Sequence, residues 1–164
     1  MSLDPTSTSA AENRASPVPW PPILLAAMIA AACILGRARP LDWPGTGDRA
    51  AHWIGLGFGG TGLLLTLAGL MALRSHDTTI MPNVRTETLV TSGPYRFLRN
   101  PIYLGEVFVM FGLAELTQNV WFVPAAFFFG LLVTVLQILP EERHLEARFG
   151  QTYRDYKSRT RRWI

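Results

Sequence analysis

Four long apolar stretches constrain the fold of this chain more than any other feature of its sequence. They cover residues 18–36, 53–73, 102–117 and 120–139. A helix needs about 20 consecutive apolar residues to cross the hydrocarbon core of a bilayer, and each stretch approaches that length. The sequence therefore predicts an all-α integral membrane protein with about four transmembrane helices.

The composition agrees with a chain that shows most of its surface to lipid. Hydrophobic residues make up 49% of the 164 residues, and charged residues only 16%. Soluble domains have about a quarter of their residues charged. The net charge is +3, but the basic residues flank the apolar stretches, which is typical of membrane proteins. We expect no nucleic-acid partner.

The distribution of lysine and arginine predicts the orientation in the membrane. With four crossings, both termini and the 74–100 loop lie on one side of the bilayer. That side carries 12 lysines and arginines, and the opposite side carries three. Because positive residues concentrate in cytoplasmic segments, both termini are expected in the cytoplasm.

The regions outside the apolar stretches have distinct compositions. Residues 1–17 are rich in serine, threonine, alanine and proline without an apolar period, which predicts a disordered segment ahead of one membrane domain spanning 18–164. In the tail 140–164, apolar and aromatic residues recur every three or four positions. This spacing predicts an interfacial amphipathic helix, with a possible bend at Gly150.

Six glycines lie in the second apolar stretch, and Gly55 and Gly59 form a G-x-x-x-G pair. Small residues at this spacing let membrane helices approach closely. No strand precedes these glycines, so a phosphate-binding loop is disfavoured. We therefore expect a packing face.

Polar residues gather where the third stretch begins. Arg99 and Asn100 precede Pro101, which suits the first turn of a helix. Tyr103 and Glu106 lie one turn apart on the same face. A carboxylate inside the membrane is costly and marks a functional site by default, although Glu106 could instead reach the interface or pair with a basic neighbour.

A second polar group lies at the end of the fourth stretch. Glu141 and Glu142 are adjacent carboxylates that repel each other and the negative end of the helix dipole. They need a positive partner, and a bound cation is one candidate. His52, His76 and His144 are scattered without the spacing of a metal site, so no metal is expected.

Together the two segments resemble the isoprenylcysteine carboxyl methyltransferase family and its bacterial relatives, within the wider group that includes phospholipid methyltransferases. The entrance motif of that family, G-x-Y-x-x-x-R-[HN]-P-x-Y-x-G, matches residues 93–105. The tail motif, E-E-x-x-L-x-x-x-F-G-x-x-Y-x-x-Y-x-x-R, matches residues 141–159 without a gap. The resemblance covers roughly residues 53–164.

The resemblance implies a methyltransferase in the membrane, expected in the bacterial inner membrane. The implied methyl donor is S-adenosylmethionine, with S-adenosylhomocysteine as product. The acceptor would be lipophilic, either a lipid or a lipid-modified molecule with a carboxylate, amine or thiol. The implied donor-binding residues come from both motifs: Tyr95, Arg99, Asn100, Pro101, Tyr103, Glu141, Glu142 and Tyr153.

Each residue type suits a part of the donor or of the reaction. Arg99 or Arg159 can pair with a carboxylate, and Glu141 or Glu142 can accept from an ammonium or ribose hydroxyl. Tyrosine faces can stack on adenine or stabilise a sulfonium. The catalytic candidates are Arg99, Arg159 and Glu106, with Glu106 as the base for an amine or thiol acceptor.

Asn100 departs from the histidine that is usual in the eukaryotic enzymes, which excludes a role for an imidazole there. Two other functions remain open. Membrane reductases that use NAD(P)H and act on sterols or steroids resemble the chain around Arg99 to Glu106. A non-enzymatic adaptor or transport protein is the other alternative.

Overall fold

The computed structural model describes residues 20–44, 47–75 and 88–164. Within these ranges the chain is helical and contains no strand. The predicted disordered segment 1–17 and His76 lie outside the described residues.

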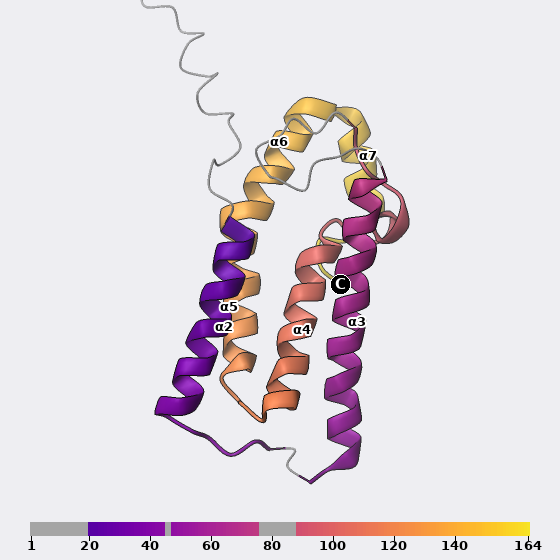
Figure 1. Cartoon of the computed structure of the whole chain (residues 1–164). Coiled ribbons are helices and arrows are strands. Elements are labelled where there is room, and N and C mark those ends of the chain that lie inside the picture. Colours follow the sequence, from indigo (N-terminus) through magenta and orange to yellow (C-terminus); the bar gives the residue numbers. More distant parts are fainter. Residues whose placement is uncertain (1–19, 45–46, 76–87) are drawn as a thin grey trace, which may run out of the picture.

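Four helices form a bundle. They are α2 (Trp20–Ala38), α3 (Arg49–Arg74), α4 (Pro101–Thr117) and α5 (Phe122–Val133). Helix α4 packs between α3 and α5, and α2 packs on the other side of α5. The chain turns at one end of the bundle between α2 and α3 and between α4 and α5, and the tail lies at the opposite end (Figure 1).

Three helical segments are long and apolar enough to cross a membrane: α2, α3 and the continuous run Phe122–Phe149. Helix α4 has 17 residues and falls short of that length, so the predicted count of four spans is not confirmed. Helix α3 begins earlier than predicted because Asp48 caps it: its Oδ1 accepts from the Ala50 amide at 2.8 Å.

The final helical run does not end at residue 139, where the sequence predicted the end of the span. Helix α5 continues through a π-helical turn, η2 (Thr134–Ile138), into α6 (Leu139–Phe149). Pro140 has no amide hydrogen to donate to the preceding turn of the helix. This missing hydrogen bond favours the change from α-helical to π-helical hydrogen bonding in η2. Gly150 then breaks the helix with a φ of 54°, which confirms the bend predicted there, and α7 (Gln151–Arg159) follows.

Glycines join α3 to α4, as the sequence predicted. A Cβ atom on Gly62 would lie 2.5 Å from the Gly105 carbonyl oxygen, and one on Gly59 would lie 3.0 Å from the Cα of Gly112. Backbones this close leave no room for a side chain. Two other glycines of α3, Gly57 and Gly60, face open space.

The interior and the outer surface of the bundle are both apolar. Met110, Phe129 and Val133 are completely buried where α4, α5 and α2 meet. Large apolar side chains are also exposed on the outside, such as Leu64 on α3 and Phe127 on α5. Such a surface suits lipid as the surrounding solvent.

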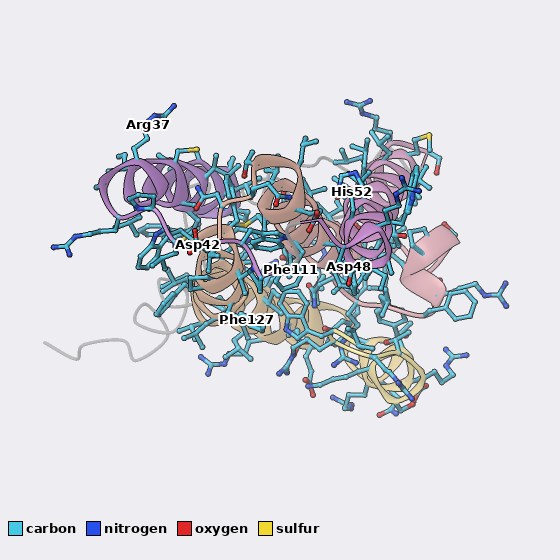
Figure 2. The ribbon with its side chains drawn as sticks, turned by 90° about the horizontal axis from the view of Figure 1, so that it is seen from below. Arg37, Asp42, Asp48, His52, Phe111 and Phe127 are labelled. Atoms are coloured by element: carbon cyan, nitrogen blue, oxygen red, sulfur yellow. The ribbon has the colours of Figure 1, made fainter. Side chains whose placement is uncertain are left out.

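A buried carboxylate ties the turns together at the end opposite the tail. Glu115 of α4 is 3% exposed and accepts from Trp43 Nε1 at 2.7 Å and Gln118 Nε2 at 3.1 Å. His52 Nδ1 lies 3.0 Å from the same carboxylate. Figure 2 shows His52 and Asp48 where α3 begins at this end. The loop after α2 is therefore anchored to α3 and α4.

The contact between α3 and α4 gives a first prediction. Gly62→Ala should lower the stability of the protein in detergent by about 1–3 kcal/mol, because a methyl group there overpacks the contact with Gly105. Thermal unfolding followed by circular dichroism measures the change. Gly60→Ala is the matched control and should leave the unfolding temperature unchanged or raise it. Equal effects of the two substitutions would contradict the close contact.

Candidate active site

The end of the tail pairs with the segment that leads into α4. The short 3-10 helix η1 (Gly93–Arg96) precedes this segment, and Leu98 and Arg161 form an isolated parallel bridge. The Arg99 amide donates to the Arg161 carbonyl at 2.7 Å, and the Arg161 amide donates to the Phe97 carbonyl at 3.0 Å. The entrance motif and the end of the tail, which are far apart in the sequence, therefore meet.

A buried carboxylate, Glu142 of α6, holds this junction together. It is 6% exposed and accepts from Arg99 Nε at 3.1 Å. Arg162 binds both of its oxygens, at 3.0 and 2.7 Å. These hydrogen bonds raise the pKa of Arg162 above its usual value. We name Arg99, Glu142 and Arg162 the ion cluster.

Arg99 also stabilises the end of α7. Its Nη1 donates to the carbonyls of Lys157 at 2.9 Å and Thr160 at 2.6 Å. A cation at a helix C-terminus satisfies carbonyls that have no partner inside the helix and interacts favourably with the dipole. Asn100 Nδ2 donates to the Arg162 carbonyl at 3.2 Å, which adds a further contact with the tail.

The positive partner that Glu142 needs is thus supplied by the protein. The resemblance implied that Arg99 and Glu142 bind the donor, and in the structure these two residues contact each other. A buried pair in which both partners are also hydrogen-bonded is costly to break.

A second group of polar side chains lies next to the ion cluster. Tyr103 is within electrostatic range of Glu141, Glu106 and Tyr95. The four residues come from η1, α4 and α6, so three elements contribute to one group. We name it the Tyr–Glu cluster. Pro101, buried in the first turn of α4, directs Tyr103 and Glu106 along one face of that helix.

Two polar atoms near the tail end of the bundle are buried without a partner among the described residues. They are Glu106 Oε2 and His144 Nδ1. A buried polar atom without a hydrogen bond is costly and rare in native proteins. Such atoms are candidates for contact with a bound molecule.

Among the described residues, Gln137 hydrogen-bonds to the carboxylate of Glu141. Glu141 is exposed to solvent, whereas Gln137 is only 6% exposed. Gln137 belongs to the π-helical turn η2, and such turns occur frequently at functional sites. The extra residue in the turn changes which side chains of α5 and α6 face the Tyr–Glu cluster.

The tyrosines of the tail extend the aromatic surface beside the ion cluster. Tyr153 is 1% exposed, and its ring lies 6.0 Å from that of Tyr156. The Tyr156 hydroxyl donates to the Tyr95 carbonyl at 2.8 Å. Burial raises the pKa of Tyr156 to about 12 and the pKa values of Tyr95 and Tyr153 further above their usual range. All three phenols are therefore neutral at physiological pH.

Arg159 is not part of either cluster. It is exposed, and its Nε donates to the Asp155 carbonyl at 3.1 Å, within its own helix. Of the residues that the sequence singled out, the structure therefore brings together Tyr95, Tyr103, Glu106 and Glu141, and separately Arg99, Asn100, Glu142 and Tyr153.

Sequence reasoning missed Gln137, His144 and Arg162 as members of this region. The signal for Gln137 was a lone polar residue in an apolar stretch. Arg162 carried no signal of its own, because seven lysines and arginines follow Pro140 and the sequence does not show which one turns inward.

Comparison with known proteins gives the family of the chain. A stretch of 36 residues is 47% identical to an uncharacterised protein of Haemophilus influenzae, covering 22% of this chain and 57% of that protein. No solved structure matches the chain. The profile of the family described as phospholipid methyltransferase matches residues 50–152, which include α3, α4, α5, α6 and the cluster residues Tyr95 to Glu142. The chain therefore belongs to the phospholipid methyltransferase family.

Proposed function

We propose that the protein transfers a methyl group from S-adenosylmethionine to the amine of a membrane lipid. The observation that carries this proposal is the Tyr–Glu cluster, in which Glu106 has a buried oxygen with no hydrogen-bond partner in the described part of the chain. The cluster lies at the tail end of helices that suit a lipid surrounding, so a lipid headgroup could reach it from the bilayer.

The chemistry of the Tyr–Glu cluster fits the positive groups of the donor. Its ammonium and sulfonium are cations, and the cluster offers the carboxylates of Glu106 and Glu141 with the ring faces of Tyr95 and Tyr103. Carboxylates pair with ammonium groups, and aromatic faces attract cations. The ion cluster has a different role in this proposal: it holds the tail against α4 and so positions Glu141.

The bound donor supplies an electrophilic methyl group, and the chain orients the acceptor and removes its proton. A lipid amine attacks the methyl carbon as the carbon–sulfur bond breaks, and the sulfur keeps that electron pair. The amine must lose a proton to become a nucleophile, and Glu106 Oε2 can accept it. Positioning the two reactants supplies much of the rate. A carboxylate acceptor would not need this base.

We also propose that α4 is the fourth crossing and that both termini lie in the cytoplasm. Its 17 residues correspond to about 25 Å of helix, near the lower limit for a span. The turn that follows it lies at the end of the bundle opposite the tail. Among the described residues, the tail end carries most of the arginines.

Substitution of Glu106 tests its role as the base. Glu106→Gln should lower methyl transfer from radiolabelled donor to phosphatidylethanolamine by about 10²- to 10⁴-fold, because general bases contribute that much. Glu146→Gln, which removes a half-exposed carboxylate paired with Lys157, is the matched control and should keep full activity. Full turnover by Glu106→Gln would exclude an amine acceptor with this base.

Binding measurements separate the proposed function from its alternatives. Calorimetric titration in detergent should detect binding of S-adenosylhomocysteine and no binding of NADPH. Glu142→Gln should weaken S-adenosylhomocysteine binding at least tenfold, because Arg99 and the partly exposed Arg162 lose their charged partner and the tail separates from α4. Binding of NADPH alone would indicate a reductase, and binding of neither ligand would remove the methyl donor from the proposal.

Labelling of single cysteines tests the orientation. In a Cys33→Ser background, Ser92→Cys and Ser158→Cys should react with an impermeant maleimide only from the cytoplasmic side. Thr117→Cys, at the other end of α4, should react only from outside. All three positions are exposed in the structure. Labelling of Ser92→Cys and Thr117→Cys from the same side would show that α4 does not cross.

A further inference from the structure

An apolar groove of about 410 Å³ runs along the seam between α4 and α5. Its walls are four residues of α4 between Leu104 and Phe111 and five residues between Ala126 and Thr134. The two helices are antiparallel, and each contributes about two turns, or about 10 Å. Phe111 and Phe127 meet at one end, with ring centroids 5.7 Å apart (Figure 2).

The side chains that α4, α5 and η2 contribute to the groove are apolar except for one. Thr134 is its one residue with a side-chain hydroxyl, and that hydroxyl donates to the Gly130 carbonyl at 2.6 Å. The rim includes Phe127 and Leu131, which are 67% and 59% exposed on the outer surface. In a bilayer the groove therefore opens directly to the hydrocarbon region, and a hydrocarbon chain fits its lining.

The other end of the groove adjoins the candidate active site. Leu104 follows Tyr103 in α4, and Val107 follows Glu106. At this end the wall is formed by Trp163 and Ile164 of the tail. Arg162, the residue before Trp163, is held by Glu142, so the ion cluster determines where the indole lies.

We propose that Trp163 positions the acceptor, by forming the wall of a groove that holds one hydrocarbon chain of the acceptor lipid. This inference rests on the proposed function and names how its substrate is held. Trp163 packs against the core of the bundle, lines the groove and directly follows Arg162 of the ion cluster. Tryptophan suits such a boundary because its ring is large and apolar and its N–H is polar.

Gly130 is the position at which a substitution can fill the groove. Gly130 lies in the wall, and a Cβ atom there would meet the side chain of Val107 at 3.8 Å, an ordinary contact. A larger side chain at this position can therefore point into the groove without disturbing the backbone. A larger side chain at position 130 would fill the groove and exclude a hydrocarbon chain. The ion cluster and the Tyr–Glu cluster would stay intact.

Photocrosslinking tests the groove without requiring methyl transfer. The probe is phosphatidylethanolamine with a diazirine midway along one acyl chain, mixed into phosphatidylcholine nanodiscs that contain the full chain. Crosslinks should concentrate on peptides covering 104–111 and 126–134, and Gly130→Leu should reduce them at least fivefold. Gly60→Leu, on an open face of α3, is the matched control and should leave them unchanged. Crosslinks spread evenly over all helices, as from bulk lipid, would overturn the proposal.

Kinetics then test Trp163 itself. Trp163→Ala should raise KM for phosphatidylethanolamine at least fivefold and change the affinity for S-adenosylhomocysteine by less than twofold. Trp163→Phe should bring KM for the lipid most of the way back to that of the unsubstituted protein. Equal losses of lipid and S-adenosylhomocysteine binding would show a merely structural role and overturn the inference. If the unsubstituted protein neither binds S-adenosylhomocysteine nor transfers a methyl group, the proposed function fails, and the crosslinks still report on the groove.

Discussion

The pairing of Glu142 with Arg99 and Arg162 is the interaction on which the tail end of the protein depends. It joins the entrance of α4 to α6 and to the residues after α7. A buried carboxylate with two guanidinium partners stays in place because separating them would leave charges uncompensated in a region of low dielectric constant. The Tyr–Glu cluster and the wall at Trp163 both take their positions from this junction.

The rest of the bundle provides a rigid frame for that junction. Close glycine contacts set the separation of α3 and α4, and Glu115 anchors the opposite end. The π-helical turn and the break at Gly150 then direct α6 and α7 over the end of the helices. Regular helices therefore build the frame, and two local irregularities turn the tail back onto it.

Much of this architecture was predictable because lipid constrains it so strongly. The apolar lengths predicted the long helices, and the glycine spacing predicted a packing face on α3, which the structure shows against α4. The resemblance implied that the two motifs lie together, and in the structure Arg99 contacts Glu142. The continuation of the last helix to Phe149 was not predicted, because Pro140 and the charges after it indicate a helix end in sequence.

By itself, the sequence determined the membrane class, the packing glycines and the residues from which a site could be built. Only the tertiary structure decided how those residues pair. The sequence shows four acidic and seven basic residues after residue 139, but pairing depends on which side chains lose contact with water. Burial places Glu142 against Arg99 and Arg162, whereas Arg159 stays exposed and Glu106 keeps an oxygen that none of the described residues binds. That difference arises from long-range packing, which local spacing does not encode.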